Sequence, residues 1–579
     1  MIHRSERWER LKTTAWDVLV IGGGITGAGI LHQAARLGLR ASLIERRDFA
    51  WGTSSRSSKM VHGGLRYLKT GDVQLTYESV RERGALLNAA PGLVEELGFL
   101  IATYAGDTPG ALAYRAGLSL YDVMATGERR HTAHSHYSAE EFLMLAPHLR
   151  REGLLGGFRY VDAQTDDARL VMRVLNDADA RGALALNYCA AERLIREGGR
   201  VVGVNTLEGA TGEEAPIRAR VVIAATGAWA DDLRGQVGAA AKIRPLRGSH
   251  LVIPAWRLPV AQVVSFAHPL DGRPVFVYPW EGVTLIGTTD VDHHDDLRAE
   301  PRISPEEVSY LLAGALWQFP AAGVTLDDVI GTWAGVRPVV GTGKADPSKE
   351  SRDYAVWDEE GLITVTGGKL TTFRLMALDA LAAAHRYLPD MPEPDRAAPP
   401  IDPNPPMPTE DDLAAIPLSV AQVERIMGRY STHALEIFGF IAAHPEEAEP
   451  IPGTLSLWAE LRHSAHCESV QHLDDLLLRR TRIGMLLPRG GVDHLPRIRA
   501  VCQRELGWDD GRWAAEEAAY QELWAAHYSV PDRALISDPA TLLRGIVRAK
   551  KKNPLPLLSA FAVLIGVLGV WLLLRPQRG

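Results

Sequence analysis

Four cationic side chains, scattered along the sequence, have the chemistry needed to hold an anion. They are Arg66 in HGGLRYL, Arg337 in GVRPV, Arg352 in SRDY and Lys369 in GGKLTT. A guanidinium group binds a carboxylate or a phosphate through two parallel hydrogen bonds, and an ammonium group adds a point charge. Because like charges repel when they are gathered in one place, we expect these residues to share a bound carboxylate or phosphate.

A histidine elsewhere in the chain could serve proton transfer. His250 follows Gly248 and Ser249 and opens an apolar, strand-like segment. Its imidazole titrates near neutral pH, as a general base requires. A lone histidine is also common in protein cores, so the residue type alone leaves both interpretations open.

The element that must position this chemistry is the segment from Asp17 to Glu45. An apolar strand, VLVI, runs into Gly22, Gly24 and Gly27 in a G-x-G-x-x-G pattern, and a helix and second strand then end at Glu45. In such a βαβ unit the first glycine makes a tight turn, the second lets the backbone approach a pyrophosphate, and the third lets the helix pack on the strand. The acid binds a ribose and argues against a 2′-phosphate. The segment therefore predicts a bound dinucleotide.

A polar loop directly follows this unit. The run TSSRSSKMVHGGLRYL, residues 53–68, contains several hydroxyls, a lysine, a histidine and a Gly-Gly pair. A serine-rich loop is often only a flexible connection. Its place after the second strand of a nucleotide fold instead favours a ligand-binding loop. A later strand that ends in Thr226-Gly227 suits another close approach to the cofactor, although an ordinary turn has the same sequence.

Composition limits the class of protein. The chain has 579 residues, 46% of them hydrophobic, which gives room for about three or four folded domains. The formal net charge of −8, with both signs mixed, gives no indication of a nucleic-acid partner. Cys189, Cys467 and Cys502 form no close-spaced pair, which argues against a zinc site or a disulfide framework and favours buried thiols. The N-terminal residues lack the apolar stretch of a secretory signal.

Two sequence patterns predict the secondary structure of the regions outside the nucleotide-binding unit. From about residue 70 to residue 150, apolar residues such as Val94 and Leu97 recur at helical spacing. Ile243 to Asp290 alternates apolar residues with Pro and Gly and turns at Glu281-Gly282, which predicts an antiparallel sheet with a hairpin. That sheet is the natural place for a substrate.

The second half of the chain changes character twice. Residues 331–375 are expected to return to the nucleotide domain, where backbone N–H groups after Gly367-Gly368 can hold an electron-rich ring edge. A Pro-rich segment, 388–408, predicts a linker. Residues 409–530 then show amphipathic helical patterns.

The last segment predicts a membrane anchor. Leu555 to Leu574 contains twenty residues without a charge, long enough at about 1.5 Å per residue to cross a hydrocarbon core of about 30 Å. Five basic residues precede it, at positions 544, 548 and 550–552, and two follow it. This excess predicts a single-pass protein of the cytoplasmic membrane with its catalytic domains on the cytoplasmic side.

Several of these motifs together resemble the FAD-dependent, respiratory glycerol-3-phosphate dehydrogenase family. They are GGGITGAGI, TSSRSSKMVHGGLRYL, GVRPV, SRDY and TGGKLTTFR, and the resemblance extends over roughly residues 15–535. HGGLRYL and GGKLTT are far more specific than the glycine pattern. The resemblance implies a non-covalent FAD, oxidation of glycerol 3-phosphate to dihydroxyacetone phosphate, and transfer of electrons to a membrane quinone within the lipid bilayer.

The resemblance and the patterns above together give the expected domain organisation, in which the linker follows from the Pro-rich composition and the transmembrane helix from the uncharged segment, not from the resemblance. We expect an α/β fold of the glutathione-reductase and amino-acid-oxidase type, in which a Rossmann-type FAD-binding domain carries an antiparallel-sheet substrate domain. The expected ranges are 15–390 for the discontinuous FAD-binding domain, about 70–160 and 243–330 for the inserted substrate domain, 388–408 for the linker, 409–535 for a helical C-terminal cap domain and 554–574 for a single transmembrane helix.

The resemblance also implies roles for individual residues. His250 is the expected base and Arg337 the cation that stabilises a developing alkoxide, with substrate contacts from Arg66, Tyr67, His250, Arg337, Arg352 and Lys369. The expected FAD contacts are Gly22, Gly24, Ile25, Thr26, Gly27, Glu45, Thr53, Ser54, Ser58, Lys59, His62, Gly63, Gly64, Leu65, Ala191, Thr226, Gly227, Gly335, Gly368, Lys369, Leu370 and Thr371.

Some alternatives stay open at this stage. The cation cluster would also suit an amine or amino-acid oxidase of the same fold, and a membrane-tethered flavin-binding protein without turnover is a third class. His131, His134 and His136 are close together, but no acid or cysteine lies at ligand spacing, and flavin chemistry needs no metal, so none is expected. The oligomeric state is not determined by the sequence, and a homodimer is among the alternatives.

Overall fold

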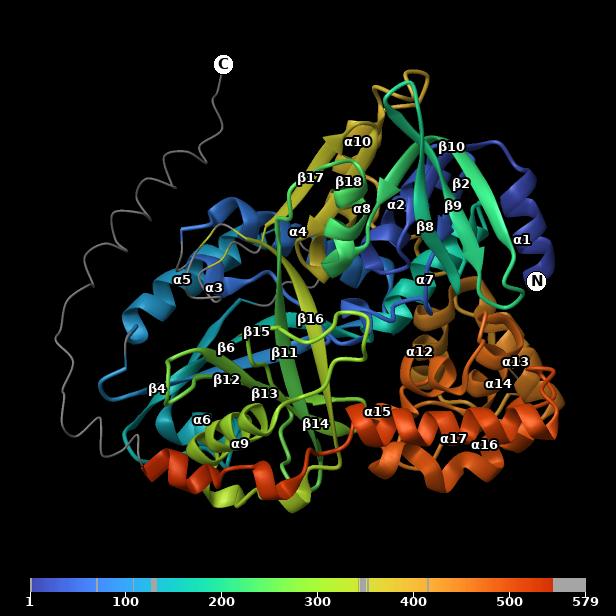
Figure 1. The fold of residues 1–579 in the computed structure, drawn as a ribbon. Coiled ribbons are helices and arrows are strands. Elements are labelled where there is room, and N and C mark those ends of the chain that lie inside the picture. Colours follow the sequence, from blue (N-terminus) through green and yellow to red (C-terminus); the bar gives the residue numbers. More distant parts are fainter. Residues whose placement is uncertain are drawn as a thin grey trace.

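The computed structural model describes residues 3–68, 71–107, 109–126, 133–341, 343, 350, 353–413 and 416–544. Two predicted features lie outside these residues: Arg352 and the apolar segment 554–574. Within the described residues, no helix combines the length and the apolar character needed to cross a membrane. Figure 1 shows a parallel sheet with its helices, a larger mainly antiparallel sheet, and a helical region formed by the C-terminal part of the chain.

The first sheet forms the nucleotide-binding fold. Its strands follow the order β17 (Tyr354–Glu359), β18 (Leu362–Gly367), β10 (Glu214–Ala224), β1 (Trp16–Ile21), β2 (Ala41–Ile44) and β7 (Leu184–Leu186). All neighbours are parallel except β17, and a hairpin of β8 (Cys189–Glu197) and β9 (Arg200–Glu208) extends β10. This topology is the one that the glycine motif predicts.

Alternate residues of the central strand β1 belong to two different hydrophobic cores, one on each face of the sheet. Val18 and Val20 belong to a core with α2 (Ile25–Arg36), α7 (Asp167–Asp179) and α10 (Phe373–Ala384). Leu19 and Ile21 face the opposite core, which includes α1 (Arg4–Thr13), α8 (Ala230–Gln236) and the β8–β9 hairpin. Since both faces are buried, the strand is an uninterrupted apolar run rather than an alternating one.

The second sheet has ten strands and lies below the first in Figure 1. Its order is β15 (Val291–Asp292), β11 (Ile243–Pro254), β14 (Val283–Gly287), β13 (Pro274–Trp280), β12 (Val263–Ala267), β4 (Val94–Tyr104), β6 (Leu154–Thr165) and β3 (Met60–Val61), with β16 (Gly331–Val340) paired to β11 and β5 (Ser135–Ser138) paired to β6. The predicted hairpin joins β13 to β14, and both turn residues, Glu281 and Gly282, have positive φ values of 48° and 90°. Such a two-residue turn follows the twist of the strands.

Two predictions about this sheet are wrong. Val94 and Leu97 were expected in a helix, but they lie in β4, which pairs with β6. Residues 331–340 were expected in the nucleotide domain, but β16 pairs with β11 along ten residues. In both cases the partner strand is distant in the sequence, so local spacing does not reveal it.

Helices cover the rest of this region. A short α3 (Leu65–Leu68) leads into α4 (Val73–Ala89), and α5 (Ala111–Met124), α6 (Ala139–Leu145) and α9 (Pro305–Gln318) pack around the ten-stranded sheet. Asp166 caps α7, since its carboxylate accepts a hydrogen bond from Arg169 N.

The Pro-rich segment 388–408 connects the nucleotide-binding domain to the C-terminal helical region, and it packs against the protein rather than extending into solvent. Ile401 is fully buried. The carbonyl of Pro399 accepts a hydrogen bond of 2.6 Å from Arg36, and the Asn404 side chain bonds both Arg173 and the Pro91 carbonyl. These contacts hold the segment against the nucleotide-binding domain.

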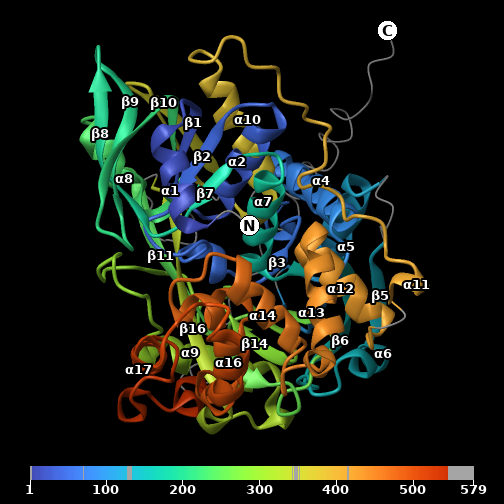
Figure 2. The ribbon, with the colours of Figure 1, turned by 90° about the vertical axis from the view of Figure 1, so that its right-hand side faces the viewer.

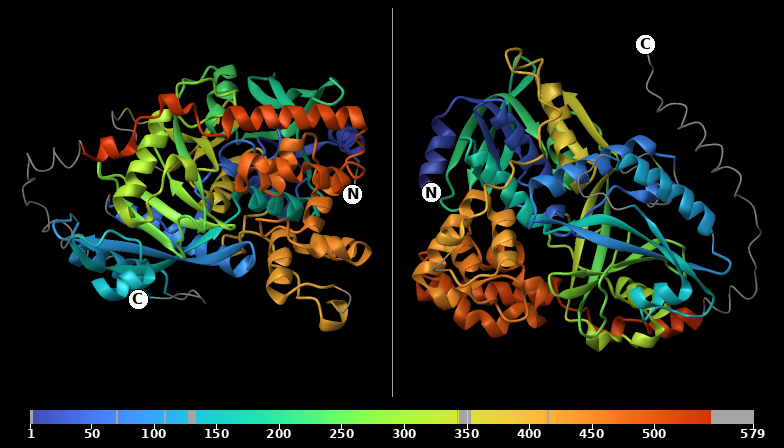
Figure 3. Two further views of the ribbon diagram at one scale, coloured as in Figure 1. Left: turned by 90° about the horizontal axis from the view of Figure 1, so that it is seen from below. Right: turned by 180° about the vertical axis from the view of Figure 1, so that it is seen from behind.

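The C-terminal region is helical, as predicted. Its helices are α11 (Glu410–Leu413), α12 (Val420–Tyr430), α13 (Ala434–Ala443), α14 (Trp458–Cys467), α15 (Ile483–Leu486), α16 (Leu495–Cys502) and α17 (Asp510–His527), with a π-helical segment, η9 (Asp475–Arg480), between α14 and α15. Figures 2 and 3 show these helices gathered on one side of the molecule, next to both sheets. One hydrophobic core contains Trp280 and Trp333 of the ten-stranded sheet together with Leu477, Ile483 and Trp513 of this region.

Candidate active site

The glycine loop between β1 and α2 packs so closely that two of its glycines cannot be replaced without movement. Gly22 has φ +116°, and a Cβ placed on it would lie 2.5 Å from the Ala225 carbonyl oxygen. A Cβ on Gly27 would lie 1.9 Å from the Gly22 carbonyl oxygen. At Gly24 the nearest atom would be Ser54 Oγ at 3.1 Å. This contact is tight, but its partner is a side-chain hydroxyl and not backbone, so Gly24 is the least enclosed of the three glycines, as the approach of a pyrophosphate requires.

The N-terminus of α2 faces this opening. Gly24 is the N-cap and has no side chain to satisfy the first N–H groups; Ile25 N donates to Ser54 Oγ at 3.0 Å. The partial positive charge of a helix N-terminus favours an anion beside Ile25 and Thr26. Thr53, in η1 (Thr53–Ser55), donates its hydroxyl to the Val336 carbonyl and so joins the loop to β16.

Glu45 lies at the end of β2, where a ribose-binding acid belongs. Its carboxylate accepts hydrogen bonds from Gly23 N at 2.6 Å and Arg47 N at 2.8 Å. Burial raises the pKa of Glu45, and the two N–H donors partly oppose that shift. The Glu45 carbonyl accepts from Cys189 N, which brings the start of β8, with Ala191 two residues on, to the same edge of the sheet.

A buried polar atom without a protein partner lies nearby. Thr226 follows β10, and within the described part of the chain its Oγ1 is buried and has no hydrogen-bond partner. Gly227 has φ +55°, and its carbonyl accepts from Thr366 of β18. A buried hydroxyl of this kind is satisfied when a polar ligand occupies the site. The open glycine loop, the helix N-terminus, Glu45 and Thr226 together fit a dinucleotide.

The segment from Thr53 to Tyr67, which we call the polar segment, connects all parts of the site. It contacts α2 through Ser54, β16 through Thr53 and β11 through Ser58. The His62 carbonyl accepts a hydrogen bond of 3.3 Å from Thr371, in η6 (Leu370–Thr372) after the Gly-Gly turn. Burial and the nearby cations lower the pKa of His62 to about 4.

His250 lies on β11 under the polar segment. Its ring is fully buried and stacks on Trp333 with the ring centroids 4.8 Å apart. Nε2 is 2.9 Å from Ser58 Oγ, while Nδ1 has no hydrogen-bond partner within the described residues. Burial, with Arg337 and Lys59 nearby, holds the pKa of His250 well below its usual value. The imidazole is therefore neutral at neutral pH and can accept a proton.

Arg337 lies one strand away on β16, held in place by oxygen atoms. Its guanidinium contacts the Asp290 carboxylate at 3.1 Å, Thr288 Oγ1 at 3.0 Å and the Thr289 carbonyl at 3.3 Å. Gly248 is the matching small residue on β11, because a Cβ there would come within 2.4 Å of the guanidinium. The side chain remains 29% exposed, so Arg337 can reach a ligand while Asp290 fixes its position.

Arg66, Tyr67 and Lys369 form a second cationic group. The Lys369 ammonium lies 4.3 Å from the centre of the Tyr67 ring, and the Arg66 guanidinium lies 5.0 Å from it. Lys369 also donates to Ser79 Oγ at 2.6 Å. Burial is the main cause of the lowered pKa of Lys369, and Arg66 contributes. In the described part of the chain, neither cation forms an ion pair with a carboxylate.

The remaining predicted residues divide between the site and the packing around it. Leu65, Leu370 and Thr371 adjoin the cationic group in α3 and η6. Gly63, Gly64, Gly335 and Gly368 are required by protein neighbours, since a Cβ on each would lie 2.2 to 2.8 Å from Tyr121, Tyr67, Arg56 or Met376. These glycines therefore serve packing, whatever ligand lies beside them.

The side chain of Lys59, an expected cofactor contact, is bound within the protein. Its ammonium is fully buried and donates to both oxygens of Asp167, at 2.8 and 2.9 Å, and to the Ser55 carbonyl. The side chain points into the protein because Asp167, at the start of α7, neutralises its charge. Burial lowers the pKa of Lys59 to about 7.

No sequence pattern indicates several of the residues that complete the site. Asp290 fixes Arg337, Trp333 supports His250, and Ser79 bonds Lys369. Asp290 directly precedes β15 and Trp333 lies within β16, and neither position is distinguished by a local sequence pattern. Only pairing between distant strands brings them to the site.

Comparison with known proteins agrees with this geometry. Residues 17–376 match the sequence model of the FAD dependent oxidoreductase family, and residues 406–513 match that of the C-terminal domain of alpha-glycerophosphate oxidase. Glycerol-3-phosphate dehydrogenase 2 of Mycobacterium tuberculosis is 35% identical to this chain, over 96% of each chain. This chain belongs to the FAD-dependent glycerol-3-phosphate dehydrogenase family. Its cofactor is FAD.

Two further relatives of this FAD-dependent oxidoreductase agree. Aerobic glycerol-3-phosphate dehydrogenase of Staphylococcus aureus is 38% identical over 66% of this chain and 69% of its own length. The crystal structure of a glycerol-3-phosphate dehydrogenase from Bacillus halodurans, complexed with FAD, superposes with a TM-score of 0.72 at 29% identity. That superposition covers 90% of this chain and 97% of the other, so both the FAD-binding part and the helical region are shared.

Proposed function

We propose that this protein oxidises sn-glycerol 3-phosphate to dihydroxyacetone phosphate and that its electrons pass to a membrane quinone. The family supports the reaction type. The observation that carries the proposal is the course of the polar segment. It touches the glycine loop, the strand of Arg337, His250 and the cationic group around Tyr67. We propose that a small ligand held among them contacts a phosphate-binding group and a base at once.

The phosphate is expected to bind between Arg66 and Lys369. The Arg66 guanidinium and the Lys369 ammonium lie 5.0 and 4.3 Å from the centre of the Tyr67 ring. Within the described residues, neither forms an ion pair with a carboxylate. Gathering two cations without a counter-ion is unfavourable, and a dianion reverses that cost. Arg337 differs because Asp290 already compensates its charge. Arg352 lies outside the described residues and remains a proposed fourth contact from its sequence motif.

The substrate hydroxyl is expected to lose its proton toward His250. The imidazole is neutral, and Ser58, which is only partly buried, lies at hydrogen-bonding distance from Nε2. Ser58 can therefore accept the proton from the substrate oxygen while passing its own to Nε2. Arg337 lies on β16, which pairs with the strand of His250, and we propose that it stabilises the negative charge that develops on that oxygen. Tyr67 orients the substrate from the phosphate side.

FAD, when bound, supplies the acceptor for the hydride that leaves the substrate carbon. The residues that would hold it are Gly22, Gly24, Glu45, Thr226 and the backbone after Gly368. The role of the protein is to fix the substrate, to take the proton and to exclude competing reactions. The electrons then leave for a second acceptor, which we propose to be quinone.

The membrane part of the proposal depends on sequence. Residues 555–574 contain no charge and follow a basic cluster. An apolar stretch of this length suits a membrane-spanning helix, and the preceding basic residues favour the cytoplasmic side for the catalytic domains. Anchoring would concentrate the flavin domain at the surface where quinone is found.

Anaerobic reduction of the bound flavin tests the substrate. We expect rapid bleaching by glycerol 3-phosphate and slow bleaching by glycerol. Lys369→Met and Arg66→Leu should narrow the ratio of these two rates at least tenfold, because both remove a phosphate contact. Arg81→Leu, which removes an exposed cation of α4, should leave the ratio unchanged. Bleaching by amino acids instead would assign the site to an oxidase, and equal rates with glycerol would refute the phosphate site.

A further inference from the structure

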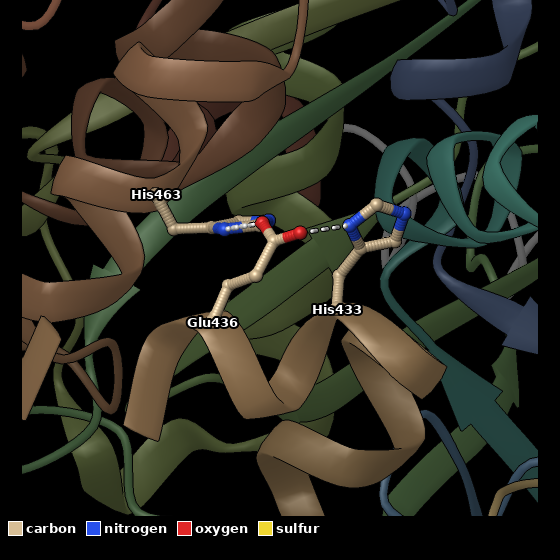
Figure 4. A group of neighbouring side chains, drawn as sticks. All are labelled: His433, Glu436 and His463. Carbon is tan, nitrogen blue, oxygen red and sulfur yellow. Dashed lines mark hydrogen bonds and ion pairs between the residues drawn. The ribbon is translucent and has the colours of Figure 1, made fainter. Parts of the chain in front are cut away.

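A second constellation of reactive side chains lies in the C-terminal helical region, away from the flavin site. His433 ends η7 (Ser431–His433), Glu436 lies in the first turn of α13, and His463 lies on α14. Figure 4 shows the three side chains turned toward one another, with the Glu436 carboxylate between the two imidazoles. His433 and Glu436 are three residues apart and thus share a helix face.

The donor atoms have the spacing of metal ligands. His433 Nδ1 lies 3.3 Å from Glu436 Oε1, and His463 Nδ1 lies 3.4 Å from Glu436 Oε2. A tetrahedral zinc ion with bonds of about 2.0–2.1 Å to nitrogen and oxygen sets neighbouring donors about 3.3–3.4 Å apart. One donor atom from each residue lies within 4.8 Å of both others, so small side-chain rotations complete the geometry.

The charges around Glu436 distinguish this group from two similar ones. In the group of His32, Asp177 and Asp402, arginines at 3.0 and 2.9 Å neutralise both carboxylates. In the group of His444, Glu446 and Glu447, Arg462 binds Glu447. Within the described residues, Glu436 contacts only His433, His463 and Cys467, with no lysine or arginine. A cation is therefore the missing counter-charge.

Two further residues support a metal at this place. Cys467, one helical turn after His463, has its Sγ 3.6 Å from Glu436 Oε2. That separation matches a thiolate at about 2.3 Å and a carboxylate oxygen at about 2.0 Å from one zinc ion. The other nitrogen of His463, Nε2, lies 4.0 Å from the Glu468 carboxylate, which Arg169 holds in place. This distance is too long for a hydrogen bond, but the carboxylate adds negative charge behind the proposed histidine ligand.

We propose that His433, Glu436 and His463, together with the Cys467 thiolate, bind one divalent transition-metal ion, with Zn²⁺ the best match. Imidazole and thiolate donors favour zinc over magnesium or calcium. The thiol proton is released to solvent when the metal binds. The ion would join the start of α13 to α14 and so hold the C-terminal region together. It would take no part in the flavin chemistry.

The experiment measures zinc on the untagged, FAD-loaded protein after removal of metal by a chelator and titration with Zn²⁺. We expect about one zinc per chain to survive desalting, and the melting temperature to rise by at least about 2 °C with zinc. Glu436→Gln, at a half-exposed position, should weaken zinc binding by at least tenfold and remove the thermal shift. Glu446→Gln, in the group that Arg462 already compensates, should change neither.

A second probe reports the thiolate. Co²⁺ in place of Zn²⁺ should give tetrahedral ligand-field bands at wavelengths beyond the flavin absorption, and Cys467→Ser should alter them while keeping some binding. His433→Gln serves if Glu436→Gln does not fold, since it removes a ligand at the edge of the cluster. Failure of the wild-type protein to retain zinc, or equal retention by Glu436→Gln and His433→Gln, would overturn the proposal. An adventitious ion would bind the control and the variants alike.

Discussion

At the scale of single residues, the glycines of the G-x-G-x-x-G motif are required for different physical reasons. A Cβ on Gly27 would overlap the Gly22 carbonyl at 1.9 Å, whereas one on Gly24 would meet only the Ser54 hydroxyl at 3.1 Å. Gly24→Ala should therefore fold but crowd the pyrophosphate, and we expect at least tenfold weaker FAD binding. Gly27→Ala should fail to fold stably, because backbone atoms block it. Flavin fluorescence titration and circular dichroism check both results, and a Gly24→Ala protein with normal affinity would contradict the assignment.

His250 has a neutral imidazole, and its reaction should depend on pH accordingly. The base works only when unprotonated, so flavin reduction should fall as the pH drops through the His250 pKa, which lies below 6.5. His250→Gln should slow single-turnover reduction about a hundredfold and remove this acid limb. His148→Gln, at a part-exposed histidine distant in sequence, is the control. Unchanged reduction in His250→Gln would move the role of base to another residue.

His62 should make the stability of the fold sensitive to acid. Its pKa falls from 6.5 to about 4 on folding, so the unfolded chain binds a proton first as the pH drops. The stabilisation is present above pH 6.5 and is lost as the pH falls toward 4, by up to about 2 kcal/mol between pH 7.5 and 5. Urea unfolding at fixed FAD concentration measures it. His62→Asn should have a flatter pH dependence than wild type over this range, and parallel curves would refute the assignment.

At the scale of elements, a buried carboxylate joins the C-terminal region to the nucleotide-binding domain. Asp48 accepts hydrogen bonds from Arg479 at 2.6 Å and from Arg480 at 2.8 Å, both in η9. Asp48→Asn leaves buried positive charge unbalanced, which typically costs about 3–5 kcal/mol. We expect a large loss of unfolding free energy in denaturant titrations. Asp493→Asn, in the exposed pair with Arg489, should show no resolvable change in unfolding free energy. A small loss of unfolding free energy in Asp48→Asn would mean that Asp475 compensates the arginine charges.

The elements also show what sequence can predict. The glycine loop and the β13–β14 hairpin were predicted because each depends on neighbours within a few residues. Strands β4 and β16 were misassigned because their partners, β6 and β11, lie far along the chain. The partner of the Lys59 ammonium could not be predicted for the same reason, since Asp167 is 108 positions away. The proposed zinc ligands could not be found from cysteine spacing, because three of the four are not cysteines and two segments supply them.

At the scale of the whole molecule, the predicted membrane anchor can be separated from the chemistry. Removing residues 554–579 should leave a folded flavoprotein that reduces an artificial dye with glycerol 3-phosphate at the wild-type rate. Quinone reduction in membranes should fall, and the protein should become extractable by carbonate, because apolar burial rather than charge holds it. Membrane flotation and quinone assays check these outcomes.

The matched control keeps the apolar segment and changes the basic residues 548 and 550–552 to glutamine. This variant should remain resistant to carbonate and lose only the salt-sensitive part of its binding, at about 1 kcal/mol for each charge. If the truncated protein still resists carbonate, the anchor lies elsewhere on the molecule.

The joint core of the ten-stranded sheet and the C-terminal helices has an evolutionary consequence. Trp280 and Trp333 belong to the catalytic half, yet they are buried in the same cluster as Trp513 and Leu477 from the helical half. A descendant that lost the helices would expose these indoles to water, and an exposed apolar patch promotes aggregation. Gene shortening in this lineage would therefore need compensating polar substitutions under the lost helices. Trp333, which also stacks on His250, is the position where such a substitution would most directly alter activity.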